Sequence, residues 1–132
     1  MKKVLLALFV LLTLSTSVFA KGKPVEKIVN DLVSQTQPAL PIQVDEATYL
    51  WGFDGDETSI SYFYMLKVPS TQLDIDFFTT EMEKIVLDTV VNTTDPTIKK
   101  FKKAGLSFNH IYYGVDGVLV SNITITPEDY QK

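Results

Sequence analysis

The sequence predicts an α+β fold: a single domain with the element order α-β-β-α-α-β-β, in which a four-stranded antiparallel sheet carries helices mainly on one face. Residues 59–68 are rich in β-favouring side chains that fall into two alternating sets, as in a strand. Apolar residues recur at helical spacing through residues 70–91, and Asp116-Gly117 is a hairpin signal between two β-favouring stretches. Hairpins separated by clustered helices are typical of α+β domains.

The N-terminal residues have the pattern of an export signal. Two lysines precede an apolar run over residues 4–12, and residues 18–20 are small or apolar where a signal peptidase would cut. This run is shorter than the about 20 residues that a membrane-spanning helix needs. We therefore expect a cleaved signal peptide over residues 1–20, no stable membrane anchor after cleavage, and one α+β domain over residues 21–132. The leader is of bacterial type, so we expect a periplasmic protein or, alternatively, a secreted one.

Composition narrows the classes of function. Two of the 12 lysines belong to the leader, so 10 lysines then face 16 acidic residues, the net charge changes from −4 to −6, and there is no arginine. Nucleic-acid binding is not expected, because it depends on dense Lys and Arg contacts to phosphate. The absence of cysteine excludes disulfides and thiolate metal ligands, so the hydrophobic core alone must stabilise the fold.

The first elements after the leader are predicted to be a helix and two strands. Apolar residues at helical spacing predict a helix over residues 24–34, which the prolines that follow it end. Residues 42–53 have the β-favouring composition of a strand at their end, and residues 59–68 form the clearest strand of the chain.

The stretch that joins these two strands, WGFDGDETS at residues 51–59, holds three carboxylates close together. A calcium loop of the EF-hand type needs ligands at alternating positions and a bidentate Glu at position 12. Only Asp54 and Asp56 fit that spacing, and Met65 stands at position 12. Asp-Gly with neighbouring polar residues instead favours a turn, so neither a metal site nor another cofactor is predicted.

A long helix is predicted to follow, with Ser70 as its N-cap and an end near Val91. One broad apolar stripe of this helix should face the core. A second, thinner stripe that includes Phe77 and Leu87 is expected to contact the first helix, or alternatively to form a partner surface.

The last part of the chain is predicted to form a short helix and a hairpin. Asp95-Pro96 has the features of a helix start, and Gly105 those of a helix end. The four lysines of this helix would complement its C-terminal dipole, or alternatively bind an anionic partner. Strands are expected over residues 106–113 and 118–126, joined around Asp116-Gly117.

Three stretches carry a resemblance to a known family: LPIQVDEATYL at residues 40–50, SISYFYML at residues 59–66, and YYGVDGVLVSNITITPEDY at residues 112–130. They resemble a family of small exported bacterial proteins with an LPxxVDExT motif, a YxY strand and a C-terminal YxxxDG…TPxD hairpin. The resemblance implies export and an α+β domain, and it implies no reaction. It would also imply two cysteines, in whose places this sequence has Asn92-Thr93-Thr94 and Tyr130.

The candidate binding residues are aromatic side chains on the predicted strands, with the single histidine among them: Trp51, Tyr62, Tyr64, His110 and Tyr112. Both alternating sets of the strand at residues 59–68 include large apolar side chains, and helices on one face can cover only one set. Some aromatic surface should therefore stay open to a partner. We expect an exported, non-enzymatic binding or accessory protein, such as an inhibitor, an immunity-type protein or an envelope-complex component, with an envelope or secreted protein as its partner.

Two other functions remain alternatives at this point. His110 could act as a general base in a small hydrolase, provided that it lies at the edge of a pocket beside a carboxylate. Alternatively, a hydrophobic ligand could be carried between the sheet and the helices, which would need a cavity there.

Overall fold

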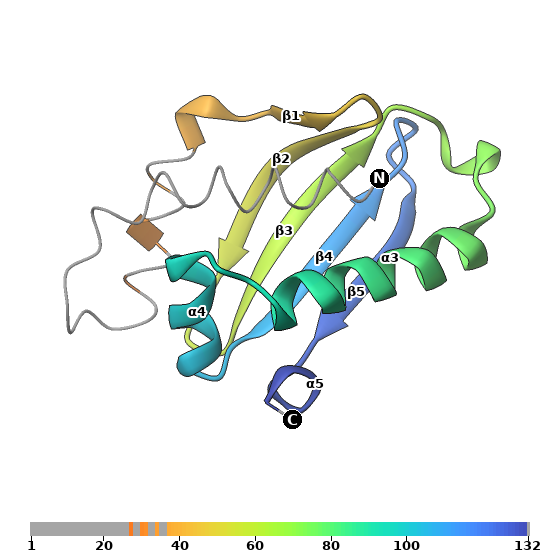
Figure 1. Ribbon diagram of the computed structural model, residues 1–132. Helices are drawn as coiled ribbons and strands as arrows, with labels where there is room; N and C mark the ends of the chain where they lie inside the picture. The colour runs from red at the N-terminus through yellow and green to blue at the C-terminus, as the bar shows by residue number, and fades with distance from the viewer. Residues whose placement is uncertain (1–26, 28–29, 32–33, 35–36, 132) are drawn as a thin grey trace.

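One mixed sheet organises the molecule (Figure 1). The computed structural model describes residues 27, 30–31, 34 and 37–131. Its strands are β1 (Ile42–Asp45), β2 (Thr48–Gly55), β3 (Ser59–Leu66), β4 (Ser107–Tyr113) and β5 (Leu119–Ile125), which lie side by side in that order. Its helices are α3 (Ile75–Val91), α4 (Pro96–Lys103) and the short α5 (Pro127–Tyr130). The predicted α+β class is confirmed, and α3 and α4 lie on the same face of the sheet (Figure 1).

The predicted number of strands is wrong, because residues 42–53 fold back on themselves. The chain reverses after β1, where the Asp45 carboxylate accepts a hydrogen bond from the Ala47 backbone N–H at 2.8 Å. Such a bond stabilises a turn locally. β1 then pairs with β2 in antiparallel fashion, which makes five strands instead of four.

The sheet is also not wholly antiparallel. β3 and β4 run parallel, with Tyr62 beside His110 and Tyr64 beside Tyr112. Parallel neighbours need a long crossover connection, and α3 and α4 supply it. The other pairs, β1 with β2, β2 with β3, and β4 with β5, are antiparallel.

The predicted helix over residues 24–34 and the signal peptide fall mostly outside the described residues. Lys27, Asn30, Asp31 and Ser34 are helical, in agreement with the prediction at those positions. Residues 1–20 lie outside the described part of the chain. None of the described helices is long and apolar enough to cross a membrane.

The long helix begins later than its predicted N-cap. Ser70 starts a 3-10 turn (Ser70–Gln72), and Asp74 caps α3 by accepting a hydrogen bond from the Phe77 N–H at 3.1 Å. Ser70 does not cap the helix because its hydroxyl donates to the Asp116 carboxylate at 2.7 Å, in the turn between β4 and β5. A contact 46 residues away in sequence thus decides where α3 starts.

The β4–β5 turn and the β3–α3 connection are joined by several hydrogen bonds. The Asp116 carboxylate also accepts from the Ser70 backbone N–H at 3.1 Å, and the Val115 N–H donates to the Val68 carbonyl at 3.0 Å. The bonds from Ser70 lower the pKa of Asp116 below its usual value. Gly117 has a φ of 79°, as expected for the Asp-Gly hairpin signal, and the predicted hairpin is confirmed.

The short helix α4 starts and ends as predicted. The Asp95 carboxylate accepts hydrogen bonds from the N–H groups of Thr97, at 2.8 Å, and Ile98, at 3.4 Å. Pro96 occupies the first helical turn, and Gly105 follows the helix with a φ of 78°.

Asp95→Ala is expected to lower the free energy of unfolding by about 1 kcal/mol, because an N-cap carboxylate satisfies N–H groups that otherwise lack a partner. Urea denaturation at neutral pH measures this change. Glu57→Ala, which removes an exposed carboxylate from the β2–β3 turn, is the control and should stay within about 0.5 kcal/mol of wild type. Equal stabilities of the two variants would contradict the capping role.

The core lies between the sheet and the helices. Its largest fully buried side chains come from β2, β3, β4 and α4. The buried residues of α3 are Phe78, Met82, Val86 and Val90. Their spacing of four residues places them on one side of the helix, which packs across β5.

Candidate functional site

The helix-covered face of the sheet brings together four of the five predicted binding residues. Tyr62 and Tyr64 of β3 lie beside His110 and Tyr112 of β4. The rings stack in a row: centroids are 4.8 Å apart for Tyr62 and His110, 5.6 Å for Tyr64 and His110, and 4.7 Å for Tyr64 and Tyr112. Because α3 and α4 lie over this face, all four side chains are buried. They are core residues, so the prediction of an accessible binding face made of them is wrong.

Burial sets the protonation of this aromatic row. The Tyr64 hydroxyl and His110 Nδ1 share a hydrogen bond of 3.0 Å. Removal from water lowers the pKa of His110 to about 3, since the charged imidazolium is the form that loses hydration. The same cause raises the pKa of Tyr62, Tyr64 and Tyr112. At neutral pH the row therefore consists of uncharged rings.

This environment does not support the hydrolase alternative. A general base must reach the proton that it abstracts from a bound substrate. His110 is fully buried below the helices, and its ring is stacked between two tyrosines. Among the residues that the structure describes, no group of three or more His, Cys, Asp or Glu side chains is placed to hold a metal ion.

The acidic stretch between β2 and β3 forms a turn. One oxygen of the Asp56 carboxylate accepts hydrogen bonds from the Thr58 N–H at 2.8 Å, the Thr58 hydroxyl at 2.9 Å and the Ser59 N–H at 3.0 Å. These bonds lower the pKa of Asp56. The predicted turn is thus confirmed, and Asp56 organises it.

One lysine of α4 has a structural role that sequence reasoning missed. Lys102 donates hydrogen bonds to the carbonyls of Val90, at 2.8 Å, and Val91, at 3.1 Å. These carbonyls belong to the last turn of α3, so the cation caps α3 and not its own helix. The sequence could not show this, because α3 and α4 had first to be placed against each other.

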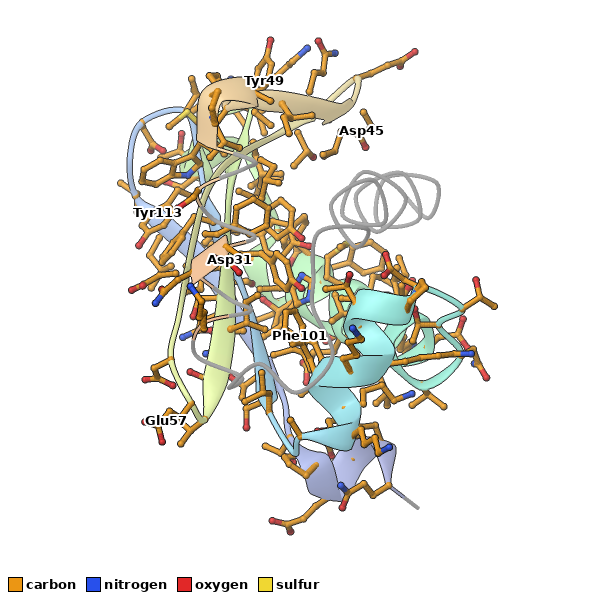
Figure 2. The ribbon with its side chains drawn as sticks, turned by 90° about the vertical axis from the view of Figure 1, so that its left-hand side faces the viewer. Asp31, Asp45, Tyr49, Glu57, Phe101 and Tyr113 are labelled. Atoms are coloured by element: carbon orange, nitrogen blue, oxygen red, sulfur yellow. The ribbon has the colours of Figure 1, made fainter. Side chains whose placement is uncertain are left out.

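The opposite face of the sheet carries a second aromatic group, centred on Trp51. Trp51 of β2 lies 5.8 Å from the ring of Phe63 in β3 and 6.2 Å from the ring of Tyr113 in β4. Trp51 is 46% exposed, and Phe63 and Tyr113 are half-buried. Figure 2 shows Tyr113 on the other side of the sheet from Phe101 and α4. We call Trp51, Phe63 and Tyr113 the open aromatic face.

Half-buried apolar side chains extend this face. Side chains alternate between the two faces of the sheet along β2, β3 and β4. Three more of them point away from the helices, as Phe63 and Tyr113 do: Tyr49, Met65 and Ile111. The expectation that some aromatic surface stays open therefore holds for Trp51. Phe63 and Tyr113 were missed as site residues, although the alternation along β3 placed Phe63 opposite to Tyr62.

The fold is similar to those of three solved bacterial proteins. A candidate secreted protein from Pseudomonas aeruginosa matches with a TM-score of 0.64 at 10% sequence identity, over 84% of this chain and 98% of that one. The type II secretion system pilotin AspS from Vibrio cholerae matches with a TM-score of 0.57 at 13% identity, over 80% and 91% of the two chains. EpsS, a type 2 secretion system pilotin from Vibrio vulnificus, matches with a TM-score of 0.57 at 14% identity, over 82% and 93%.

Sequence comparison adds no closer relative. No protein-family model matches the chain, and no curated protein shows a significant sequence match to it. At 10–14% identity, the structural similarity shows a shared fold. This chain therefore has the fold seen in a candidate secreted protein and in two pilotins of the type II secretion system.

Proposed function

We propose that the chain is an exported, non-enzymatic accessory protein of the bacterial envelope, which acts by binding another protein through its open aromatic face. The observation that carries this proposal is the exposure of Trp51, which packs against Phe63 and Tyr113 on the sheet face opposite to α4 (Figure 2). Large aromatic side chains at a surface are the residues that most often dominate binding energy between proteins.

Three further observations support export and an accessory role. The leader over residues 1–20 has the pattern of a signal peptide. The fold is shared with a candidate secreted protein and with pilotins, which serve a secretion system. The single histidine is buried, and so it offers no accessible base for catalysis.

The two alternative functions find less support. A hydrolase would need His110 at a surface pocket, whereas it is in the core. A hydrophobic carrier would need space between the sheet and the helices, whereas Phe78, Met82 and Val86 of α3 are packed into the core in that layer. Trp51, in contrast, is 46% exposed.

Capture from envelope extract tests the proposal. The full chain should retain a discrete partner, and Trp51→Ala should weaken that interaction about 30-fold, the loss expected when a surface hot spot of about 2 kcal/mol is truncated. Val118→Ala is the matched control, because Val118 is a comparably exposed apolar residue in the β4–β5 turn. Retention of the same partner by Trp51→Ala at wild-type strength would contradict the proposal.

The fluorescence of the protein gives a second readout. Trp51 is the only tryptophan of the chain, so its emission reports on the open aromatic face. Addition of the purified partner should shift the emission to shorter wavelength, since binding would remove the indole ring from water. An unchanged spectrum with a bound partner would place the contact elsewhere.

A further inference from the structure

The solvent-facing side of α3 carries an apolar stripe that the described structure leaves uncovered. Phe77, Leu87 and Val91 are 65%, 37% and 41% exposed. Thr80 and Lys84 lie between them on the same side of the helix and are also exposed. We call these five residues the α3 stripe. It belongs to the thinner stripe for which contact with the first helix or, alternatively, a partner surface was expected; most of that helix lies outside the described residues.

The spacing of the α3 stripe is that of a coiled-coil seam. Its residues follow one another at intervals of three and four positions along the helix, which is the a and d pattern of heptads. The stripe spans residues 77–91, about 21 Å at 1.5 Å per residue. The opposite side of α3 is in the core, so the stripe is the side left for a second helix.

Acidic side chains line both edges of the α3 stripe. Four of the five e and g positions next to the seam hold Asp76, Glu81, Glu83 and Asp88, and the fifth holds the core residue Val90. Asp76, Glu83 and Asp88 are exposed, and Glu81 is half-buried. The one lysine of α3, Lys84, lies 3.2 Å from Glu81, which leaves the charge of the edges predominantly negative.

We propose that the α3 stripe docks an amphipathic helix of another protein, one that carries Lys or Arg on both sides of its apolar seam. Charges at e and g positions select the partner of a helix, and acidic edges select basic ones. α3 packs on the sheet face that holds the buried core, whereas the open aromatic face, with Tyr113 labelled in Figure 2, is the opposite one. This site goes beyond the proposed function, because it gives the protein a second binding surface and a partner of stated chemistry.

Charge disfavours the two occupants that the chain itself could supply. A second copy that paired through α3 would bring acidic edges against acidic edges, which is repulsive. The predicted helix over residues 24–34 contains Glu26, Lys27 and Asp31, and therefore has no basic edges.

Two synthetic peptides test the proposal with the full chain. Both have about three heptads with the same apolar seam, and they differ in having Lys or Glu at every e and g position. Fluorescence anisotropy of the labelled peptides should show about ten-fold or more tighter binding of the Lys peptide at low salt, as expected from several facing charge pairs. High salt should reduce this preference, because ions screen exposed charges.

Charge reversal on the protein tests whether the acidic edges cause the preference for the Lys peptide. Glu83→Lys/Asp88→Lys, with one change on each edge, should remove or invert the preference for the Lys peptide. The control Asp54→Lys/Glu57→Lys makes the same change in net charge at the β2–β3 turn and should keep the preference. Phe77→Ser/Leu87→Ser should weaken the binding of the Lys peptide. If the two charge variants behave alike, or if the Glu peptide binds as well as the Lys peptide, the proposal is wrong.

Other occupants of the α3 stripe would give different results with the same variants. A wild-type protein that forms dimers, and becomes monomeric in Phe77→Ser/Leu87→Ser, would show that a second copy covers the stripe and would overturn the proposal. Trp51→Ala should bind the Lys peptide like wild type. This last comparison separates the two surfaces, so that the proposals for the α3 stripe and for the open aromatic face can be rejected independently.

Discussion

Lowering the pH from 7.5 to 4.5 is expected to cost the folded protein about 3 kcal/mol through His110 alone. In the unfolded chain the imidazole has its ordinary pKa of 6.5, whereas burial lowers the pKa to about 3 in the folded protein. Between these two values the unfolded state binds a proton that the folded state excludes. The contribution of His110 to the free energy of unfolding is therefore present above pH 6.5. It falls by about 1.4 kcal/mol for each unit of pH below that value.

The measurement is urea denaturation at both pH values for wild type and His110→Phe. The Phe variant keeps an aromatic ring in the row but has no group to protonate, so its loss of stability should be smaller by about 3 kcal/mol. Asp56 and Asp116 have pKa values lowered from 3.8, so their contributions to stability are lost mainly below the pH range of the measurement. Both are present in the two proteins, so the comparison cancels them. An equal loss in wild type and His110→Phe would show that His110 is not buried as described.

Gly114→Ala is expected to lower the free energy of unfolding by about 3 kcal/mol, the upper end of the cost of overpacking. A Cβ at this buried position would lie 2.5 Å from the Asp116 carboxylate and 2.7 Å from the Ser70 backbone nitrogen. The second contact is with backbone, which cannot rotate away. Relief of the clash would separate Ser70 from Asp116, whose hydrogen bonds join the β4–β5 turn to the β3–α3 connection.

Gly52→Ala is the matched control for this variant. At Gly52 a Cβ would meet only the Phe63 side chain, at an ordinary contact distance of 3.7 Å. We expect a change within about 1 kcal/mol, and a stabilising one is compatible with the lower entropy of the unfolded Ala variant. Thermal or urea unfolding of wild type, Gly114→Ala and Gly52→Ala measures these changes in stability. A Gly114→Ala protein as stable as Gly52→Ala would contradict the packing of the two loops.

The sequence alone determined the features that depend on local chemistry. Asp95, Pro96 and Gly105 marked the ends of α4 correctly, because capping and a positive φ involve neighbouring residues only. Asp116-Gly117 marked the last hairpin for the same reason. The α+β class followed from hairpins separated by clustered helices, since the strand and helix patterns are visible within each segment.

Only the tertiary structure decided the features that depend on distant residues. Ser70 has the residue type of an N-cap, but its hydroxyl donates to Asp116, so Asp74 starts α3. The parallel pairing of β3 with β4 depends on the path of the chain through α3 and α4, which connects the two strands.

The binding surface is the clearest case of this division. Both sets of side chains on β3 include large apolar residues, so alternation showed that two faces exist but not which one the helices cover. Packing of α3 and α4 buries Tyr62, Tyr64, His110 and Tyr112, and it leaves Trp51 exposed on the other side. The sequence alone therefore determined that an aromatic surface would remain open. The choice of face needed the tertiary structure, because burial is a property of the assembled layers and not of the strand.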